Sequence, residues 1–225
     1  MKKYQAKEAY LISNIAQQYE AKRFASPMGR FINWREKSAA VNLLKMLSIN
    51  DTSRILDLPC GTGRLSRLLY ENGHNVVAAD ISLSMINVAR GKTGMDSKVE
   101  FVVCDAEKLP FSDGVFDCVV SLRFMGFLPP QIRLKVLGEM SRVTTNWLIL
   151  FHHNPSSLKG IFRRIKDRLR GKVQEWYTIK PSDLEGELKA AGLSLARTKP
   201  ILGKLAETYA VLVTKMSPNE PGDGG

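Results

Sequence analysis

Short apolar runs that alternate with amphipathic segments constrain the fold of this chain more than any other feature. The runs begin at Ile55, Val76, Phe101, Phe116 and Trp147. Between them, apolar residues recur at helical spacing. Strands that alternate with helices indicate βαβ units and a parallel sheet. Because the runs are apolar without interruption, we expect the strands to be buried on both faces.

The last part of the chain follows a different pattern. Ser182-Asp183-Leu184-Glu185 has the spacing of a capping box, and Gly192 would end the helix that it begins. Two strands follow, 193–199 and 206–214, and the turn between them is too short for a parallel crossover. The predicted fold class is therefore α/β: a Rossmann-like, doubly wound, mostly parallel seven-stranded sheet with an antiparallel C-terminal hairpin and N-terminal helices.

The N-terminal part is predicted to be helical. Leu11, Ile15 and Tyr19 form one apolar stripe, a loop is expected at 26–29, and a second helix would carry Val41, Leu44 and Leu47 inward. The tail is rich in Pro, Gly and acidic residues, which favour disorder. The predicted organisation is a helical cap over 1–50, a sheet domain over 51–216 with a basic helical insertion or lid at 155–178, and a disordered tail over 217–225.

The composition favours a cytoplasmic protein that meets an anionic partner. The net charge is +11, which suggests nucleic acid, anionic lipid or a phosphorylated substrate. Three cysteines without metal-ligand spacing are expected to be reduced thiols, with Cys104 and Cys118 in the core. No apolar run is long enough to cross a bilayer, and the polar start lacks the apolar region of a signal peptide.

Polar residues stand where the predicted strands end. In open α/β sheets, ligands bind beyond the carboxyl ends of the strands, and these ends hold 57–63, Asp80, Asp105 and Ser121. Gly61 and Gly63 would let the backbone approach a ligand closely. The helix that follows them would offer its amino end to a carboxylate.

The other strand ends suit a nucleoside. The carboxylate of Asp80 can accept hydrogen bonds from both ribose hydroxyls. Asp105 can accept from an adenine amino group, while the amide of Ala106 donates to a ring nitrogen. Ile81 and Met85 would sandwich the base.

These residues resemble a known family. Ile55-Leu56-Asp57-Leu58-Pro59-Cys60-Gly61-Thr62-Gly63-Arg64-Leu65 resembles motif I of the class I S-adenosylmethionine-dependent methyltransferases. The segments 105–111 and 116–121 look like that family's third-strand loop and fourth strand. The resemblance is strongest to the branch that contains the ubiquinone/menaquinone C-methyltransferases. It covers about Arg54 to Phe151, and the combination of spaced motifs is more specific than any one of them.

The resemblance implies an enzyme that binds S-adenosylmethionine and methylates an acceptor. It implies that Gly61, Thr62 and Gly63 hold the methionine moiety, with Asp57 bracing the loop and the amino group. Asp80 would bind ribose, and Asp105 with Ala106 would bind adenine. Near the methionine end, close to the acceptor, it places Ser121 and Arg123.

The chain departs from the family pattern in two places. Pro59 replaces the first glycine of the loop in many members, and the segment after Ser121 lacks the histidine that relatives often carry. His153, after the fifth strand, is the candidate general base. The alternative interpretation is a hydrogen-bonded polar residue at a strand end.

The segment Leu158 to Lys172 is a predicted basic amphipathic helix, with seven Lys or Arg residues and one acid, Asp167. Such a helix can contact an anionic membrane surface, attract an anionic lipid-borne acceptor, or simply be a solvated surface helix. We therefore expect a small-molecule or lipid acceptor, and a peripheral membrane contact through this segment.

Three other functions stay open. A nicotinamide dehydrogenase would need a third glycine where Ser66 stands. A nucleic-acid methyltransferase fits the charge, but Ser121-Leu122-Arg123-Phe124 is not the usual Pro-Pro-aromatic motif of amino-group enzymes. The third is a non-catalytic protein that binds the cofactor and serves a partner.

Overall fold

A computed structural model describes residues 25–47, 49, 52–94, 98–155, 157, 161–162, 165, 169, 177–201 and 208–216. The predicted helix around Leu11 to Tyr19, the tail 217–225 and most of the basic segment lie outside these residues. Among the helices that the structure describes, none has the length and hydropathy that a membrane span requires.

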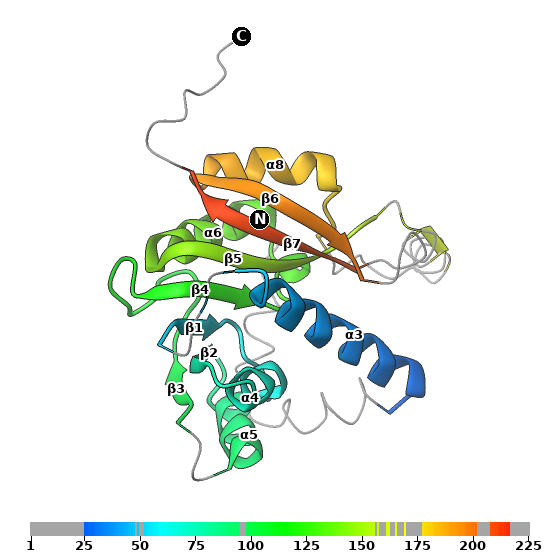
Figure 1. The fold of residues 1–225 in the computed structure, drawn as a ribbon. Helices are drawn as coiled ribbons and strands as arrows, with labels where there is room; N and C mark the ends of the chain where they lie inside the picture. Colours follow the sequence, from blue (N-terminus) through cyan, green and yellow to red (C-terminus); the bar gives the residue numbers. More distant parts are fainter. Residues whose placement is uncertain are drawn as a thin grey trace.

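The described strands form one seven-stranded sheet in the order β3-β2-β1-β4-β5-β7-β6 (Figure 1). Neighbours from β3 to β5 pair in parallel, whereas β7 pairs antiparallel with both β5 and β6. The predicted fold class, with its antiparallel C-terminal hairpin, is confirmed. The strands are β1 (Arg54–Asp57), β2 (Asn75–Asp80), β3 (Glu100–Val103), β4 (Phe116–Ser121), β5 (Thr144–His153), β6 (Leu193–Pro200) and β7 (Thr208–Lys215).

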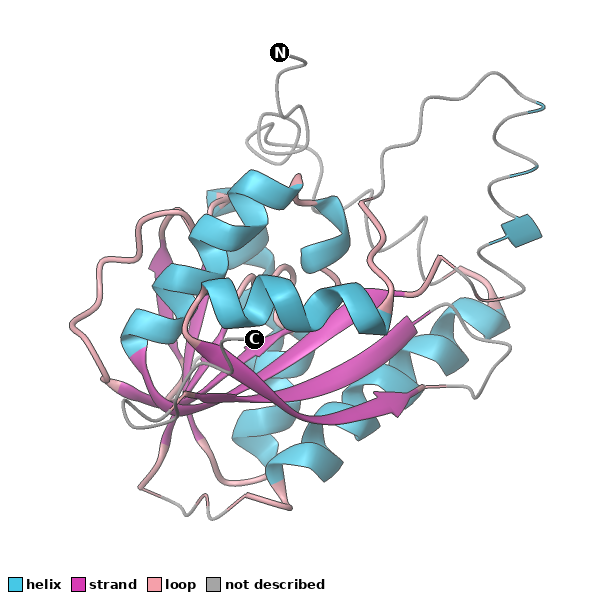
Figure 2. Cartoon of the chain, turned by 90° about the horizontal axis from the view of Figure 1, so that it is seen from above, coloured by secondary structure: helices cyan, strands magenta, loops and turns pink. Residues whose placement is uncertain are grey.

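Helices cover both faces of the sheet, so the described part of the chain has three layers (Figure 2). One core cluster joins α3, α4 and α5 to strand residues such as Ile55 and Val120. The other joins α6 and α8 to Leu56 and Val119. Alternate residues of β1 and β4 therefore enter opposite cores, which explains why residues 55–56 and 118–120 are apolar in succession. The helices are α3 (Pro27–Leu44), α4 (Arg64–Glu71), α5 (Leu83–Thr93), the 3-10 turn η1 (Met125–Phe127), α6 (Pro130–Val143) and α8 (Pro181–Ala190).

Several predicted boundaries at the ends of helices are wrong. The loop expected at 26–29 is the first turn of α3, because the Ser26 hydroxyl accepts a hydrogen bond from the Gly29 amide at 3.0 Å and Pro27 suits the first helical position. At its other end α3 stops before Leu47. The capping box at 182–185 does not form, since α8 begins at Pro181 and Ser182 lies inside it. At the start of α5, the Ser82 hydroxyl accepts from the Met85 amide at 3.5 Å and caps the helix.

Candidate functional site

A cavity opens at the carboxyl ends of β1, β2, β3 and β4. Its lining combines four carboxylates, two arginines and a large apolar surface. Three residues of the predicted cofactor set, Thr62, Gly63 and Ser121, are not part of the lining. The other eight line it: Asp57, Gly61, Asp80, Ile81, Met85, Asp105, Ala106 and Arg123.

The bend after β1 is fastened to the end of β2. The Cys60 amide donates to the carbonyl of Ala79 at 2.8 Å, and the Gly61 amide donates to the Asp80 carboxylate at 2.9 Å. Gly61 has a φ of +53°, and a Cβ atom there would meet no other atom within 4 Å. Gly61 therefore turns the chain in a left-handed conformation beside open space, which leaves room for a ligand next to the backbone.

Gly63 is required for helix packing. Its φ is +72°, and a Cβ atom at this position would lie 2.7 Å from the Cβ of Ala89 on α5. That separation is too short for two carbon atoms, so any side chain at position 63 would force α4 and α5 apart. The two glycines of the predicted loop thus differ in role, since only Gly61 lines the cavity.

Asp80 connects the bend to the start of α5. Its Oδ2 accepts from the Gly61 amide, and its Oδ1 accepts from the Ser82 amide at 2.9 Å. Burial raises the pKa of this carboxyl, because only 5% of the residue is exposed. Each carboxylate oxygen keeps a further acceptor position. The geometry is therefore compatible with the predicted hydrogen bonds to ribose.

Asp57 is the most strongly perturbed carboxyl at the cavity. It is 1% exposed, and its Oδ2 accepts from the hydroxyl of Ser66 at 2.6 Å. Burial, together with the nearby charge of Asp80, raises the pKa of Asp57 to about 7. A buried carboxyl that titrates near neutrality at a cavity wall is typical of a functional site, because a positively charged ligand would restore its ionised form.

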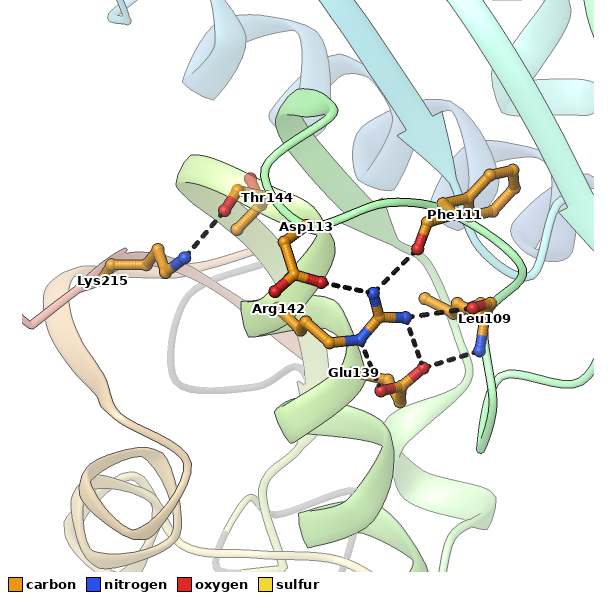
Figure 3. Close-up of polar contacts among 7 residues, drawn as sticks. All are labelled: Leu109, Phe111, Asp113, Glu139, Arg142, Thr144 and Lys215. Atoms are coloured by element: carbon orange, nitrogen blue, oxygen red, sulfur yellow. Dashed lines mark hydrogen bonds and ion pairs between the residues drawn. The ribbon is translucent and has the colours of Figure 1, made fainter.

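The loop after β3, which carries Asp105 and Ala106 to the cavity, is anchored from behind by α6 (Figure 3). Arg142 donates to the carbonyl oxygens of Leu109 and Phe111 at 3.0 and 2.8 Å. Glu139 accepts from the Leu109 amide at 2.7 Å, and its hydrogen bonds with Arg142 lower the pKa of the Glu139 carboxyl. Within the loop, the Glu107 amide donates to the Asp105 carboxylate at 3.0 Å. These hydrogen bonds fix the conformation of the loop that is predicted to bind the adenine base.

Part of the cavity lining is an apolar wall that was not predicted from the sequence. The helical spacing of Ile132 and Val136 in the sequence indicates a buried face but gives no sign that this face borders a cavity. Arg64, from the first turn of α4, also lines the cavity. The apolar members of this wall come from the segment after β4 and from α6: Leu122, Phe124, Phe127, Leu128, Ile132 and Val136.

Other residues singled out from the sequence lie off the cavity lining. Ser121 and Thr62 are buried, and the Ser121 hydroxyl finds no hydrogen-bond partner among the described residues. His153 is buried with its Nδ1 3.4 Å from the hydroxyl of Thr208. No histidine is among the described residues that line the cavity. The role of His153 as a base stays a prediction.

One cysteine expected in the core is only partly buried, because it packs against the core and also lines the cavity. Cys118 is fully buried, as predicted, but Cys104 follows β3 and lines the cavity together with Cys60. The error arose because a strand's last apolar residue and the first residue beyond it look alike in sequence. Burial raises the pKa of the Cys104 thiol to about 12 and that of Cys60 well above its ordinary value. Both thiols are therefore protonated near neutral pH and poor nucleophiles.

A mostly parallel seven-stranded sheet that ends in an antiparallel hairpin, with an acidic and apolar cavity at its carboxyl edge, defines a class I methyltransferase fold. Known proteins agree. Residues 55–146 match the family described as a methyltransferase domain. The magnesium protoporphyrin IX methyltransferase of Synechocystis, solved with bound SAH, superposes with a TM-score of 0.71 at 18% identity, over 90% of this chain and 97% of that one.

Relatives by sequence are quinone-biosynthesis enzymes. The demethylmenaquinone methyltransferase of Thermus thermophilus is 36% identical over 137 residues, 59% of each chain. The ubiquinone/menaquinone biosynthesis C-methyltransferase of Pseudomonas paraeruginosa is 32% identical over 190 residues, which cover 79% of this chain and 64% of that protein. By its fold, the chain is similar to the class I S-adenosylmethionine-dependent methyltransferases. The matched segments span less than two thirds of these relatives' own lengths.

Proposed function

We propose that this protein binds S-adenosylmethionine in the cavity and transfers its methyl group to a small-molecule or lipid-linked acceptor. The observation that carries the proposal is the meeting of Asp57, Asp80 and Asp105 around the Gly61 bend in one cavity. Three carboxylates with few compensating cations favour a positively charged ligand. Ile81 and Met85, also in the lining, supply an apolar surface of the kind that an adenine ring requires.

The residues present fit this donor. Asp57 and Asp80 carry raised pKa values because they are buried, and an ammonium and a sulfonium group nearby would stabilise both as carboxylates. Open space beside Gly61 leaves room for the amino-acid portion. Asp105 accepts from the Glu107 amide through Oδ1 and lines the cavity, where its carboxylate can accept from an exocyclic amino group.

The bound donor supplies an electrophilic methyl group, so the residues of the chain need mainly to orient the reactants and exclude water. Phe124, Phe127 and Leu128 form an apolar wall. This wall would orient an acceptor with a hydrophobic body and exclude water from it. No histidine stands in that wall, which favours an acceptor whose attacking atom is readily ionised. The named relatives act on quinone precursors, and this supports an aromatic, lipid-linked acceptor.

Two rival functions make different predictions for the acceptor. Incubation with labelled S-adenosylmethionine and fractionated lipids, small molecules and nucleic acids should place the label in a lipid or small-molecule fraction. Label confined to nucleic acid would favour a nucleic-acid methyltransferase. Tight donor binding without labelling of any fraction would favour a non-catalytic binding protein.

Asp80→Ala should weaken the binding of S-adenosylhomocysteine by roughly 1 to 3 kcal/mol, because it removes charge-assisted hydrogen bonds and frees the Gly61 and Ser82 amides. Isothermal titration calorimetry measures the change. Asp113→Asn is the control, since Asp113 is an exposed carboxylate bound to Arg142 outside the cavity. Unaltered affinity in Asp80→Ala would remove Asp80 from the site.

We also propose that the basic segment contacts anionic membranes. Four described residues at helical positions, Ile161, Phe162, Ile165 and Leu169, expose apolar side chains, with Leu169 83% exposed. The surrounding sequence from Leu158 to Lys172 holds seven cations and one acid. Exposed apolar side chains among cations suit a surface of acidic headgroups, where the apolar groups insert and the cations stay at the interface.

Vesicles of phosphatidylcholine with about a third phosphatidylglycerol should therefore sediment the protein, whereas pure phosphatidylcholine should not. The double variant Phe162→Ser/Leu169→Ser should bind the acidic vesicles at least about tenfold more weakly, because it removes two inserting side chains. Leu134→Ser is the matched control, as Leu134 is an exposed leucine on α6. Equal sedimentation by both vesicle types would contradict the membrane contact.

A further inference from the structure

Helix α3 is joined to the rim of the cavity by side chains from one stretch of its sequence. The Asn33 side-chain oxygen accepts from Arg64 Nη1 at 2.8 Å, and the Glu36 carboxylate accepts from the guanidinium of Arg123. Arg35, between them, donates to the carbonyl of Ile201 at 3.0 Å. Arg64 and Arg123 are the two arginines of the cavity lining, so α3 holds both of them.

The Glu36–Arg123 pair is unusual in its burial. The side chains of Arg123 and Glu36 are 7% and 2% exposed, and they join residues 87 positions apart in the chain. Removing two charges from water is costly, and an apolar pair of similar volume would often be at least as stable. Packing of α3 alone therefore does not account for an ion pair at this position.

The backbone of Arg123 is also in an uncommon conformation. Its φ is +59°, and it is the only residue other than glycine with a positive φ in the described part of the chain. A left-handed arginine persists only where surrounding contacts impose it, and such residues cluster at ligand-binding sites. The guanidinium of this residue is held by Glu36 at the cavity wall.

From this geometry we infer that Glu36 is a positioning residue, which holds the guanidinium of Arg123 toward the carboxylate of the bound methyl donor. The inference rests on the proposed function, because it requires an adenosyl amino acid in the cavity. Arg123 supplies N–H donors to the anionic end of the ligand, while Asp57 faces its cationic group. Glu36 touches neither and acts through Arg123. Ligand binding and the docking of α3 are then coupled, since each favours the same position of Arg123.

Two ligands separate positioning from general destabilisation. S-adenosylhomocysteine carries the amino-acid portion, whereas 5′-methylthioadenosine shares the nucleoside and lacks it. In Glu36→Gln, calorimetry should show S-adenosylhomocysteine bound about tenfold more weakly, because the ligand carboxylate loses a well-placed charge-assisted partner. The affinity for 5′-methylthioadenosine should stay within about twofold of wild type. Glu71→Gln is the matched control, since it removes the exposed ion pair with Arg67 and should change neither affinity.

A second variant covers the case in which Glu36→Gln does not fold. Glu36→Gln/Arg123→Gly removes both charges and places glycine where φ is positive, so no buried charge is left unpaired. It should show the same selective loss for S-adenosylhomocysteine. Wild-type affinity for S-adenosylhomocysteine in these variants would overturn the inference, and so would an equal loss for both ligands. If the wild-type protein binds neither ligand, the proposed function itself is wrong.

Discussion

S-adenosylhomocysteine should bind this protein roughly 10- to 30-fold more tightly at pH 7.5 than at pH 5.5, with most of the change below pH 7. Asp57 causes the change. Its pKa is raised to about 7, chiefly by burial, so in the unligated protein it is largely protonated at pH 5.5. The ammonium group of the ligand stabilises the carboxylate, and binding at low pH must therefore expel a proton.

The effect of Asp57 on folding stability has the opposite dependence on pH to its effect on ligand affinity. A carboxyl whose pKa is raised in the folded state contributes stability below its ordinary pKa and loses that contribution as the pH rises through about 7. Near neutral pH, Asp57 therefore lowers the folding stability of the unligated protein. Binding of the donor should recover most stability at the same pH. Because Asp57 is buried without a cation to stabilise it, its carboxylate lowers the stability of the fold. A cationic ligand would stabilise that carboxylate, which suits Asp57 to ligand binding.

Calorimetry across pH 5.5 to 7.5, in buffers of different ionisation enthalpy, measures both the affinity and the protons released. In Asp57→Asn the affinity should lose most of its pH dependence, because the amide can still accept from Ser66 but does not titrate. Asp113→Asn should keep the wild-type profile, since Asp113 is exposed and is not part of the lining. A wild-type affinity that is constant over this range would show that Asp57 does not face the cationic group.

The parts of the site predicted correctly depend on local patterns. Each of Asp57, Asp80 and Asp105 directly ends or follows an apolar run, and parallel strands carry their carboxyl ends to one edge. Sequence spacing alone was therefore enough to bring three acids to one cavity. The antiparallel hairpin was also predictable, because a short turn excludes a crossover.

The parts that were missed depend on contacts between distant segments. Nothing near Gly63 in the sequence indicates that Ala89 will stand against it. Glu36 looks like an ordinary charge on a polar helix, and only the fold brings it to Arg123. Helix boundaries failed for a local reason instead, since Ser26 and Pro27 are equally common in loops and in first turns.

Arg133 supports the apolar wall of the cavity from α6. Its side chain is 3% exposed, and it makes two hydrogen bonds of 2.6 Å to the carboxylate of Glu187 on α8. Its Nη1 also donates to the carbonyl oxygens of Leu128 and Tyr177 at 3.1 and 3.2 Å. One guanidinium thus joins α6 and α8 to the segment that carries Phe127 and Leu128 into the cavity lining.

Arg133→Ala should lower the free energy of unfolding by about 3 to 5 kcal/mol, because it leaves the Glu187 carboxylate and buried carbonyl oxygens without their donor. Urea unfolding, followed by tryptophan fluorescence, measures the loss. Arg67→Ala removes an exposed ion pair on α4 and should cost less than about 1 kcal/mol. The double variant Arg133→Met/Glu187→Met should recover part of the lost stability, since it leaves no charge unpaired. A loss in Arg133→Ala no larger than in Arg67→Ala would mean that water replaces the guanidinium without cost, and that the wall is held by apolar packing alone.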